Sequence, residues 1–440
     1  MPQTRQEDTL DRAGLDRVQR SKLGHALEII LRSNEFYKRK IGGLGFDAAR
    51  DPLHSLPLTT RAEIQQDQAE SPPYGSLLTY PIEKYNRLHQ TSGSGGVPMR
   101  WLDTPESWKW WCSCWDTIYQ AAGVSKSDRL FFPFSFGPFI GFWGAYDAAV
   151  AQGLFAIPAG GMTTSARLRY LLDNGVTVVL CTPTYALRLA EVAASEGIDL
   201  AGSSVRALIV AGEPGGSIAA TRARIETAWG ARVFDHPGLT EVGPWGFECV
   251  ETPGAVHVLE TEFIAEVIDP KTEQPLPDGA AGELVLTNLG RIGMPLIRYR
   301  TGDRVCLRRE RCVCGRWFAR AEGGVLGRLD DMLIIRGNNV YPAAIEGIVR
   351  EVPEVAEFRL EVDERASMAD LCIQVELTPG AAHEEIRARI EAAVRSRLHF
   401  RPRVIVMDPG SLPRFEMKAK RLVRRGGSES SGSHTPTSAS

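Results

Sequence analysis

A glycine-rich run at residues 90–98, QTSGSGGVP, is the first stretch whose residue types suggest chemistry. Glycine lets the backbone adopt conformations closed to other residues and approach a ligand closely. Consecutive N–H groups in such a loop can hold phosphate oxygens, and Thr91, Ser92 and Ser94 add hydroxyl groups. No Gly-Lys-Ser/Thr sequence follows, so the run is not the P-loop of NTPases. Taken alone, it is either a phosphate-binding loop or a flexible linker.

Two further loops carry polar residues where strands are predicted to end. Residues 211–216 read AGEPGG, and residues 235–241 read DHPGLTE. Each follows an apolar run in a region where strands alternate with helices, which indicates βαβ units and a parallel sheet. Ligands bind such sheets at the carboxyl ends of the strands. We therefore expect both loops to border a ligand site.

The elements that position these loops follow from hydrophobic periodicity. A strand at 84–89 precedes the glycine-rich run, and helices are predicted at 15–40 and 104–122. Between residues 129 and 155 an aromatic, glycine-rich segment predicts a strand, a Gly-Pro turn and an apolar helix; it is either core or a pocket for a flat apolar ligand. The alternating region predicts strands at 154–158, 176–181, 207–211 and 231–234, and helices at 163–174, 183–196 and 217–229.

The C-terminal half changes character. Residues 252–308 are strand-rich, with strands at 283–286 and 303–307. Helices at 343–351 and 383–398 and strands at 357–362 and 370–377 then predict a compact α+β module. We expect an α/β fold with a large N-terminal domain of parallel or mixed sheets, helices and a β-subdomain, plus a small mobile α+β C-terminal domain. The expected boundaries are 1–329 for the first domain, 330–425 for the second and 426–440 for a disordered tail.

Composition excludes some classes of function. The chain has 440 residues and a formal net charge of −3, so bulk electrostatics give no reason to expect nucleic acid or membrane as a partner. No run approaches the roughly 20 apolar residues of a membrane span. The polar N-terminus lacks the apolar core of a signal peptide, which favours a cytoplasmic protein. In that setting the eight cysteines are expected to be thiols or metal ligands, not disulfides.

Six motifs stand in one order along the chain, and together the chain resembles the adenylate-forming acyl-CoA synthetase superfamily, most closely the phenylacetate–CoA ligase family. The resemblance runs from about residue 56 to residue 421. The motifs are TSGSGGVP at 91–98, AGEP at 211–214, GLTEVGP at 238–244, IRYRTGD at 297–303, GRLDDMLIIRG at 327–337 and LPRFEMKAKR at 412–421.

The resemblance implies binding of ATP, Mg²⁺ and CoA and a set of nucleotide contacts. Asp303 would accept hydrogen bonds from the ribose and remain ionised, while Asp235 and His236 would lie near the adenine edge. The phosphate-binding residues would be Ser92, Gly93, Ser94, Gly95 and Gly96, and those packing on adenine would be Ala211, Gly212, Glu213 and Pro214.

The resemblance also implies the catalytic residues. Thr240 would contact the α-phosphate and Glu241 would bind Mg²⁺. Lys418 would reach the substrate carboxylate and the α-phosphate during adenylation. Arg328 would contact phosphate or ribose, and Asp330 would be the hinge about which the small domain turns. The chemistry suits these residue types, because a carboxylate attacking a phosphate brings two anions together and cations offset their repulsion.

Four departures from the family pattern bear on activity. Val97 stands where relatives often carry lysine, and Ser94-Gly95 replaces a common Thr-Thr pair, so fewer charges are expected to face the phosphates. Met417 replaces the usual glycine before the catalytic lysine. His236-Pro237 stands where many relatives have an aromatic residue. None of these changes removes Asp303, Glu241 or Lys418.

A second constellation has metal-ligand character. Cys249, His257, Cys312 and Cys314 form a Cys-x7-His and a Cys-x-Cys pattern, which resembles a structural zinc site in some relatives. Four N and S ligands would give a closed tetrahedral structural site. The alternative is four free residues. Cys306 is expected to be a buried strand residue.

The resemblance places the acyl pocket between the aromatic segment and the loops after the later strands, at Phe134, Phe136, Phe139, Ile140, Trp143, Gly212 and Pro237. It favours an aromatic acid, aryl or arylacetic, as the small-molecule substrate and CoA as the acceptor. One alternative is an adenylating enzyme that passes the acid to a carrier-protein thiol, an amine or another nucleophile. Another is a non-catalytic nucleotide-binding protein. A homodimer is one option for its assembly.

Overall fold

The chain forms two compact units in a computed structural model that describes residues 6–91, 97–141, 143–363, 369–416 and 418–425. Unit 1 comprises Met1–Asp330 together with Glu416–Lys418, and unit 2 comprises Asp331–Phe415 and Ala419–Ser440. The predicted tail at 426–440 lies outside the described residues. No helix in the described ranges is long and apolar enough to cross a membrane.

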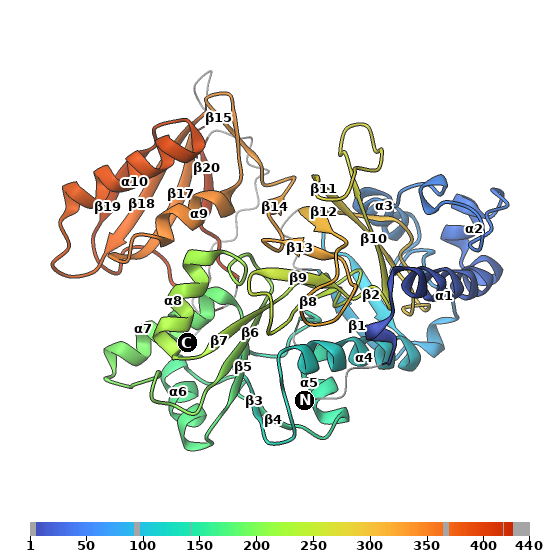
Figure 1. Cartoon of the computed structure of the whole chain (residues 1–440), viewed down its shortest axis with the longest axis horizontal. Coiled ribbons are helices and arrows are strands. Elements are labelled where there is room, and N and C mark those ends of the chain that lie inside the picture. The colour runs from blue at the N-terminus through green and yellow to red at the C-terminus, as the bar shows by residue number, and fades with distance from the viewer. Residues whose placement is uncertain (1–5, 92–96, 142, 364–368, 417, 426–440) are drawn as a thin grey trace. The chain divides into compact units, whose positions relative to one another are not determined.

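Unit 1 contains a five-stranded sheet in the order β4-β3-β5-β6-β7, in which every neighbouring pair is parallel (Figure 1). This confirms the predicted βαβ alternation. The strands are β3 (Arg129–Phe132), β4 (Phe155–Pro158), β5 (Val178–Cys181), β6 (Ala207–Ala211) and β7 (Arg232–His236); the helices around them are α4 (Pro105–Ala121), α5 (Trp143–Ala151), α6 (Thr164–Asp173), α7 (Pro183–Ser195) and α8 (Ala219–Trp229).

Both faces of this sheet are buried, because successive residues of a strand point to opposite sides. Leu130 and Phe132 join the core that contains residues of α4 and α5, whereas Phe131 joins the core that contains residues of α6, α7 and α8. Figure 1 shows these two helix groups on opposite sides of the strands. Ala211 and His236, the last residues of β6 and β7, are register partners. The two predicted ligand loops therefore start side by side.

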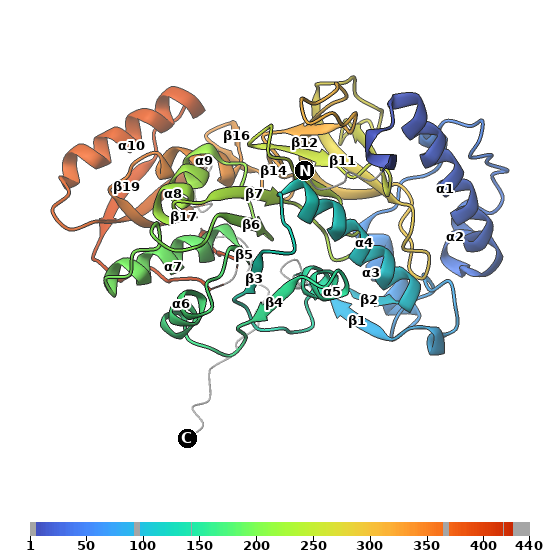
Figure 2. The same cartoon turned by 60° about the horizontal axis from the view of Figure 1, so that its bottom comes forward.

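A second, mainly antiparallel sheet forms the β-subdomain, in the order β10-β11-β12-β13-β9-β8, with β14 paired to β12 (Figure 2). Register pairs Asp303 with Arg328. Cys306 lies on the half-exposed face of β12, so the expectation that it is buried was wrong. The strands are β8 (Gly246–Glu248), β9 (Ala255–Val258), β10 (Phe263–Ile268), β11 (Ala281–Asn288), β12 (Tyr299–Arg308), β13 (Arg320–Glu322) and β14 (Gly327–Arg328).

The N-terminal part differs from the prediction of one helix at 15–40. The structure has α1 (Arg12–Ser33) and α2 (Glu35–Ile41), interrupted at Asn34. Asn34 has extended backbone, and its side chain accepts a hydrogen bond from the N–H of Tyr37, so it ends one helix and caps the next. Farther on lie α3 (Arg61–Glu70) and a two-stranded ribbon of β1 (Arg87–Gln90) and β2 (Arg100–Asp103), which frames the glycine-rich run.

Unit 2 is an α+β module around a four-stranded sheet in the order β19-β18-β17-β20. It confirms the predicted fold class for this part of the chain. Its elements are the hairpin β15 (Leu333–Ile335) and β16 (Asn338–Val340), the strands β17 (Val355–Asp363), β18 (Asp370–Leu377), β19 (Arg403–Met407) and β20 (Leu422–Arg425), and the helices α9 (Pro342–Arg350) and α10 (His383–Leu398). The short strands β19 and β20 were not predicted.

Candidate active site

Lys418 lies against the loop that follows β6. A methyl group placed on Gly212 would lie 3.3 Å from Lys418 Cε, so the absent side chain leaves room for the lysine. Desolvation lowers the pKa of Lys418, while the carboxylates of Glu213, Glu241 and Asp303 oppose this shift. The residue as a whole is exposed. Four motifs that are far apart in the sequence thus meet at one cation.

Glu241 follows β7 and is buried. Its Oε1 accepts a hydrogen bond of 3.0 Å from the hydroxyl of Tyr299 on β12. This contact holds the carboxylate in place and leaves its other oxygen available to a cation. Tyr299 stands inside the IRYRTGD motif, yet sequence reasoning gave it no role.

Arg291 fixes the backbone of the same loop, and the sequence analysis missed it. Its Nη1 donates to the carbonyl oxygens of Thr240 and Glu241 at 2.7 and 3.0 Å. Its Nε and Nη2 form a bidentate pair with Asp103 of β2 at 2.7 and 2.6 Å. Both side chains are fully buried. The one available signal was an arginine inside an apolar run, and it gave no indication of its partner.

Asp303 and Arg328 form an ion pair of 3.1 Å across β12 and β14. Arg328 also pairs with Asp330, the last residue of unit 1 before the chain enters unit 2. Burial raises the pKa of Asp303 to about 7, although Arg328 acts in the opposite direction. The expectation that Asp303 simply remains ionised took no account of the cost of desolvating a carboxylate.

Asp235 and His236 end β7, and both make contacts within unit 1. Asp235 accepts a hydrogen bond from the hydroxyl of Ser217, and burial raises its pKa. His236 Nδ1 donates to the carbonyl oxygen of Gly246 at 2.7 Å, and its ring packs edge-on against Trp115 at 4.4 Å between ring centroids. Burial lowers the pKa of His236 to about 4, so the ring is neutral.

The glycine-rich run is held at its base. Thr91 Oγ1 accepts from the N–H of Met99, and the N–H of Thr91 donates to the Met99 carbonyl, each at 3.0 Å. Val97, the departure noted above, is 76% exposed. The predicted phosphate contacts Ser92, Gly93, Ser94, Gly95 and Gly96 lie outside the described residues, as does Met417.

The middle of the aromatic segment lies close to this base, since the N–H of Gln90 donates to the carbonyl of Pro138 at 2.8 Å. Phe136 packs against Phe134 and Trp143 at 5.1 and 4.4 Å between ring centroids. Tyr146 of α5 joins them at 5.3 Å from Phe136; the sequence analysis did not name it. Ile140 is buried and Phe139 is exposed. Gly212 and Pro237 lie on the loops that follow β6 and β7.

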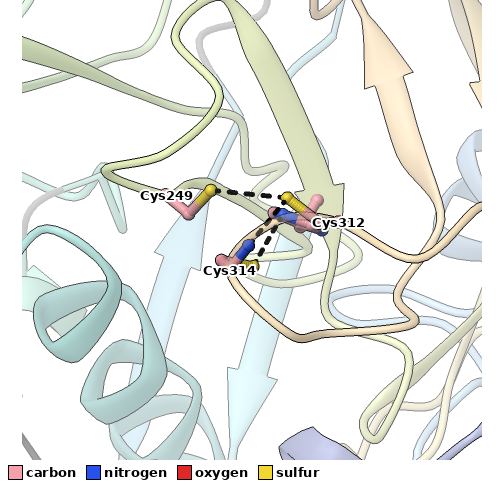
Figure 3. Close-up of side chains that lie close together, drawn as sticks. Cys249, Cys312 and Cys314 are labelled. Carbon is pink, nitrogen blue, oxygen red and sulfur yellow. Dashed lines mark hydrogen bonds between the residues drawn. The ribbon is translucent and has the colours of Figure 1, made fainter.

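Cys249, His257, Cys312 and Cys314 lie together, with their ligand atoms all within 4.8 Å of one another. Figure 3 shows the sulfur atoms of Cys249 and Cys312 facing each other, at 3.9 Å. Cys314 Sγ lies 3.6 Å from His257 Nε2. Tetrahedral zinc with ordinary bond lengths would separate two sulfurs by about 3.8 Å and a sulfur from an imidazole nitrogen by about 3.6 Å. The donor set therefore fits zinc.

The histidine of this cluster is oriented by a second contact. His257 Nδ1 lies 3.4 Å from the carbonyl oxygen of Phe318, to which it can donate. Such a contact fixes the tautomer and leaves Nε2 free to face the cysteines. The four residues of this cluster lie on β9 or on loops of the β-subdomain. The cluster therefore connects parts of that subdomain and does not include the predicted nucleotide-binding loops.

Two family models match the chain. One, the AMP-binding enzyme, matches residues 91–290, and the other, the AMP-binding enzyme C-terminal domain, matches residues 337–425. A solved structure of 2-hydroxyisobutyryl-CoA ligase superposes with a TM-score of 0.90 and 26% sequence identity, covering 96% of this chain and 91% of that chain. Fold and matches together define an adenylate-forming enzyme of the AMP-forming acid–thiol ligase class.

Two relatives fix the family. Phenylacetate-coenzyme A ligase of Thermus thermophilus is 30% identical over 434 residues, which covers 93% of this chain and 96% of that protein. The Escherichia coli protein of the same name is 31% identical over 432 residues, covering 94% and 96%. The chain belongs to the phenylacetate–CoA ligase family, as its motifs predicted.

Proposed function

We propose that the chain activates an aromatic carboxylic acid, aryl or arylacetic, with ATP and then transfers the acyl group to CoA. In the first step a carboxylate oxygen attacks the α-phosphorus, acyl-AMP forms and pyrophosphate leaves. In the second step the thiolate sulfur attacks the acyl carbonyl and AMP leaves. The observation that carries this proposal is the meeting of Lys418 with Gly212, Glu213, Glu241 and Asp303.

The chain's own residues have distinct roles in the first step. Lys418 neutralises charge as the carboxylate approaches the α-phosphate, and Thr240 contacts that phosphate. Glu241 is the residue that would hold Mg²⁺, which neutralises phosphate charge when bound. Asp303 accepts from the ribose hydroxyls and Arg328 holds Asp303. We take Asp330 as the hinge, because the chain passes from one unit to the other directly after it.

The aromatic substrate is supported by the rings at Phe134, Phe136, Trp143 and Tyr146 and by the name of the curated relatives. The solved relative, in contrast, acts on an aliphatic hydroxy acid by its name. Acid-dependent ATP–pyrophosphate exchange across aryl, arylacetic, aliphatic and amino acids separates the two. We expect aryl or arylacetic acids to give the highest kcat/KM. A preference for 2-hydroxyisobutyrate or an amino acid would contradict the proposal.

The acceptor is tested on the same enzyme. Acyl-AMP formed in the absence of acceptor is trapped and then offered CoA, a carrier protein with its thiol arm, or an amine. We expect thioester with CoA. Product with carrier protein or amine alone would favour the alternative adenylating enzyme, and no acyl-AMP with any acid would favour a non-catalytic nucleotide-binding protein.

We further propose that Cys249, His257, Cys312 and Cys314 bind one structural zinc. Metal analysis of the purified protein should find one zinc per chain. Cys312→Ser should lose that zinc and lower the free energy of unfolding by more than about 2 kcal/mol, because the metal ties strand β9 to two separate loops of the subdomain. Cys306→Ser, a cysteine outside the cluster, is the matched control. Full stability and no zinc in the unaltered protein would contradict the proposal.

The buried carboxyl of Asp303 predicts pH-dependent nucleoside binding. With a pKa of about 7 in the folded chain, Asp303 changes from protonated to ionised between pH 6 and pH 8. Because only the ionised form accepts from both ribose hydroxyls, affinity for adenosine should rise about tenfold over this range. Adenosine carries no phosphate that titrates there, so calorimetry reports the protein group. Asp303→Asn should bind weakly at both pH values, and an unchanged rise in that variant would contradict the assignment.

The raised pKa of Asp303 also makes the stability of the fold depend on pH. The folded pKa is raised above the unfolded value, so between about pH 4 and pH 7 the unfolded chain is ionised at this residue while the folded chain holds the proton. The contribution of Asp303 to stability therefore falls as the pH rises through this window. Asp303→Asn should remove that part of the pH dependence.

A further inference from the structure

Glu416, two residues before Lys418, makes specific contacts on unit 1. Its Oε1 accepts a hydrogen bond of 2.9 Å from the hydroxyl of Thr164. Its Oε2 lies 3.6 Å from Nη1 of Arg167. Both partners lie on α6, more than 240 residues earlier in the sequence. The segment Glu416–Lys418 belongs with unit 1, although the residues on either side of it belong to unit 2.

The receiving surface is ordered by hydrogen bonds of its own. Arg167 is 4% exposed; its Nε donates to the Ala159 carbonyl at 3.0 Å and its Nη1 donates to the hydroxyl of Tyr185 at 2.7 Å. That hydroxyl lies 3.3 Å from Thr164 Oγ1. Thr164, Arg167 and Tyr185 thus form one network, which we call the α6 socket.

The charge of the α6 socket explains why it takes a carboxylate. A buried guanidinium is costly unless an anion compensates it. Within the described ranges, Glu416 is the one acidic residue recorded in an ion pair with Arg167. The other acceptors of Arg167 are a carbonyl and a hydroxyl, which are uncharged. Thr164 also opens α6, where the helix dipole favours a negative group.

The spacing connects the α6 socket to the reacting centre. Two residues of extended chain span at most about 7 Å, so fixing Glu416 confines Lys418 to a small volume. In the structure that volume contains the position beside Gly212. We propose that Glu416 is a positioning residue, whose docking in the α6 socket holds Lys418 at the adenylation centre. This inference rests on the proposed function of Lys418.

If Glu416 only stabilised the fold, its loss would affect both half-reactions equally. Because Arg167 is 4% exposed, the loss of its anion is also expected to lower stability, so stability alone does not separate a positioning role from a structural one. The effect of Glu416 is expected on the half-reaction that needs Lys418 and not on the half-reaction that does not. The two half-reactions are therefore measured separately, with the full chain and the best acid of the substrate panel.

Glu416→Gln keeps the size of the side chain and removes the charge. We expect the rate of acid-dependent ATP–pyrophosphate exchange to fall roughly tenfold, as for one lost charge-assisted hydrogen bond. Thioester formation from supplied acyl-AMP and CoA should not fall. Glu273→Gln is the matched control, because Glu273 is similarly exposed and pairs with the less exposed Arg300. An unchanged exchange rate, or an equal loss in both half-reactions, would overturn the proposal.

Two further measurements tie the effect to the α6 socket. If Glu416 and Thr164 act through one contact, Thr164→Val combined with Glu416→Gln should be no worse than the more damaging single change. If the reductions in exchange rate caused by the two single changes instead multiply in the double variant, the two residues do not act through one contact. Limited trypsin digestion should cleave after Lys418 several-fold faster in Glu416→Gln than in the unaltered protein and in Glu273→Gln, since undocking releases the loop from its anchor. Equal cleavage in all three would overturn the docking.

The failure of this inference is distinguishable from that of the proposed function. If the unaltered protein shows no acid-dependent exchange, the proposed function fails, while the trypsin measurement still decides whether Glu416 docks. If exchange is present and depends on Lys418 but not on Glu416, only the positioning role fails.

Discussion

Lys418→Ala should lower the rate of acid-dependent ATP–pyrophosphate exchange by about 100-fold or more, because it removes the cation that offsets repulsion between the carboxylate and the α-phosphate. The structure brings Lys418 Cε into contact range of Gly212, beside Glu213, Glu241 and Asp303. The effect should be on kcat more than on the KM for ATP, since the lysine acts in the transition state.

Lys420→Ala is the control for this prediction. Lys420 lies two residues farther along the same basic run and is exposed, so its loss tests whether general charge on the loop matters. It should leave the exchange rate unchanged. With supplied acyl-AMP and CoA, Lys418→Ala should form thioester at the rate of the unaltered protein. Exchange that persists in Lys418→Ala would contradict the role of the lysine in the first step.

Arg291→Met should lower the free energy of unfolding of unit 1 by about 3–5 kcal/mol, because it leaves the buried carboxylate of Asp103 without its cation. Both side chains have no exposed surface, and the pair is bidentate. Arg309→Met, which breaks the partly exposed pair with Asp278, should cost less than about 1 kcal/mol. Urea unfolding followed by tryptophan fluorescence measures both variants.

A double change separates the two roles of Arg291. Arg291→Met with Asp103→Leu removes both buried charges, so much of the stability should return. Pyrophosphate exchange should remain low, because the carbonyl oxygens of Thr240 and Glu241 still lack their donor. If Arg291→Met left the free energy of unfolding unchanged, the buried ion pair would contribute little to stability. If the double variant kept full exchange activity, Arg291 would not position the loop.

The fold of unit 1 could be predicted where the signal is local. Strands such as 207–211 are short apolar runs between helices with clear periodicity, and the structure reproduces that strand residue for residue. The single N-terminal helix predicted at 15–40 missed the break at Asn34, because the apolar spacing continues through this residue while its side chain caps a second helix. Hydrophobic periodicity alone does not show where a capping residue interrupts a helix.

The sequence predicted which motifs form the candidate site but not the residues that hold those motifs in place. Loops at the carboxyl ends of β6 and β7 were expected to border a ligand, and register places their first residues side by side. The partners that hold those loops are not local. Arg291 meets Asp103 across 188 positions, and Glu416 meets Thr164 across 252. The raised pKa of Asp303 likewise depends on burial by the folded chain, which no spacing in the sequence expresses.

Isotope transfer tests the central claim most directly. The chain is incubated with ATP, CoA and its best acid labelled with ¹⁸O in both carboxylate oxygens, and the products are examined by mass spectrometry. Formation of acyl-AMP predicts that one labelled oxygen appears in AMP. Label absent from AMP, or found in inorganic phosphate formed together with ADP, would contradict activation of the acid as an acyl-adenylate.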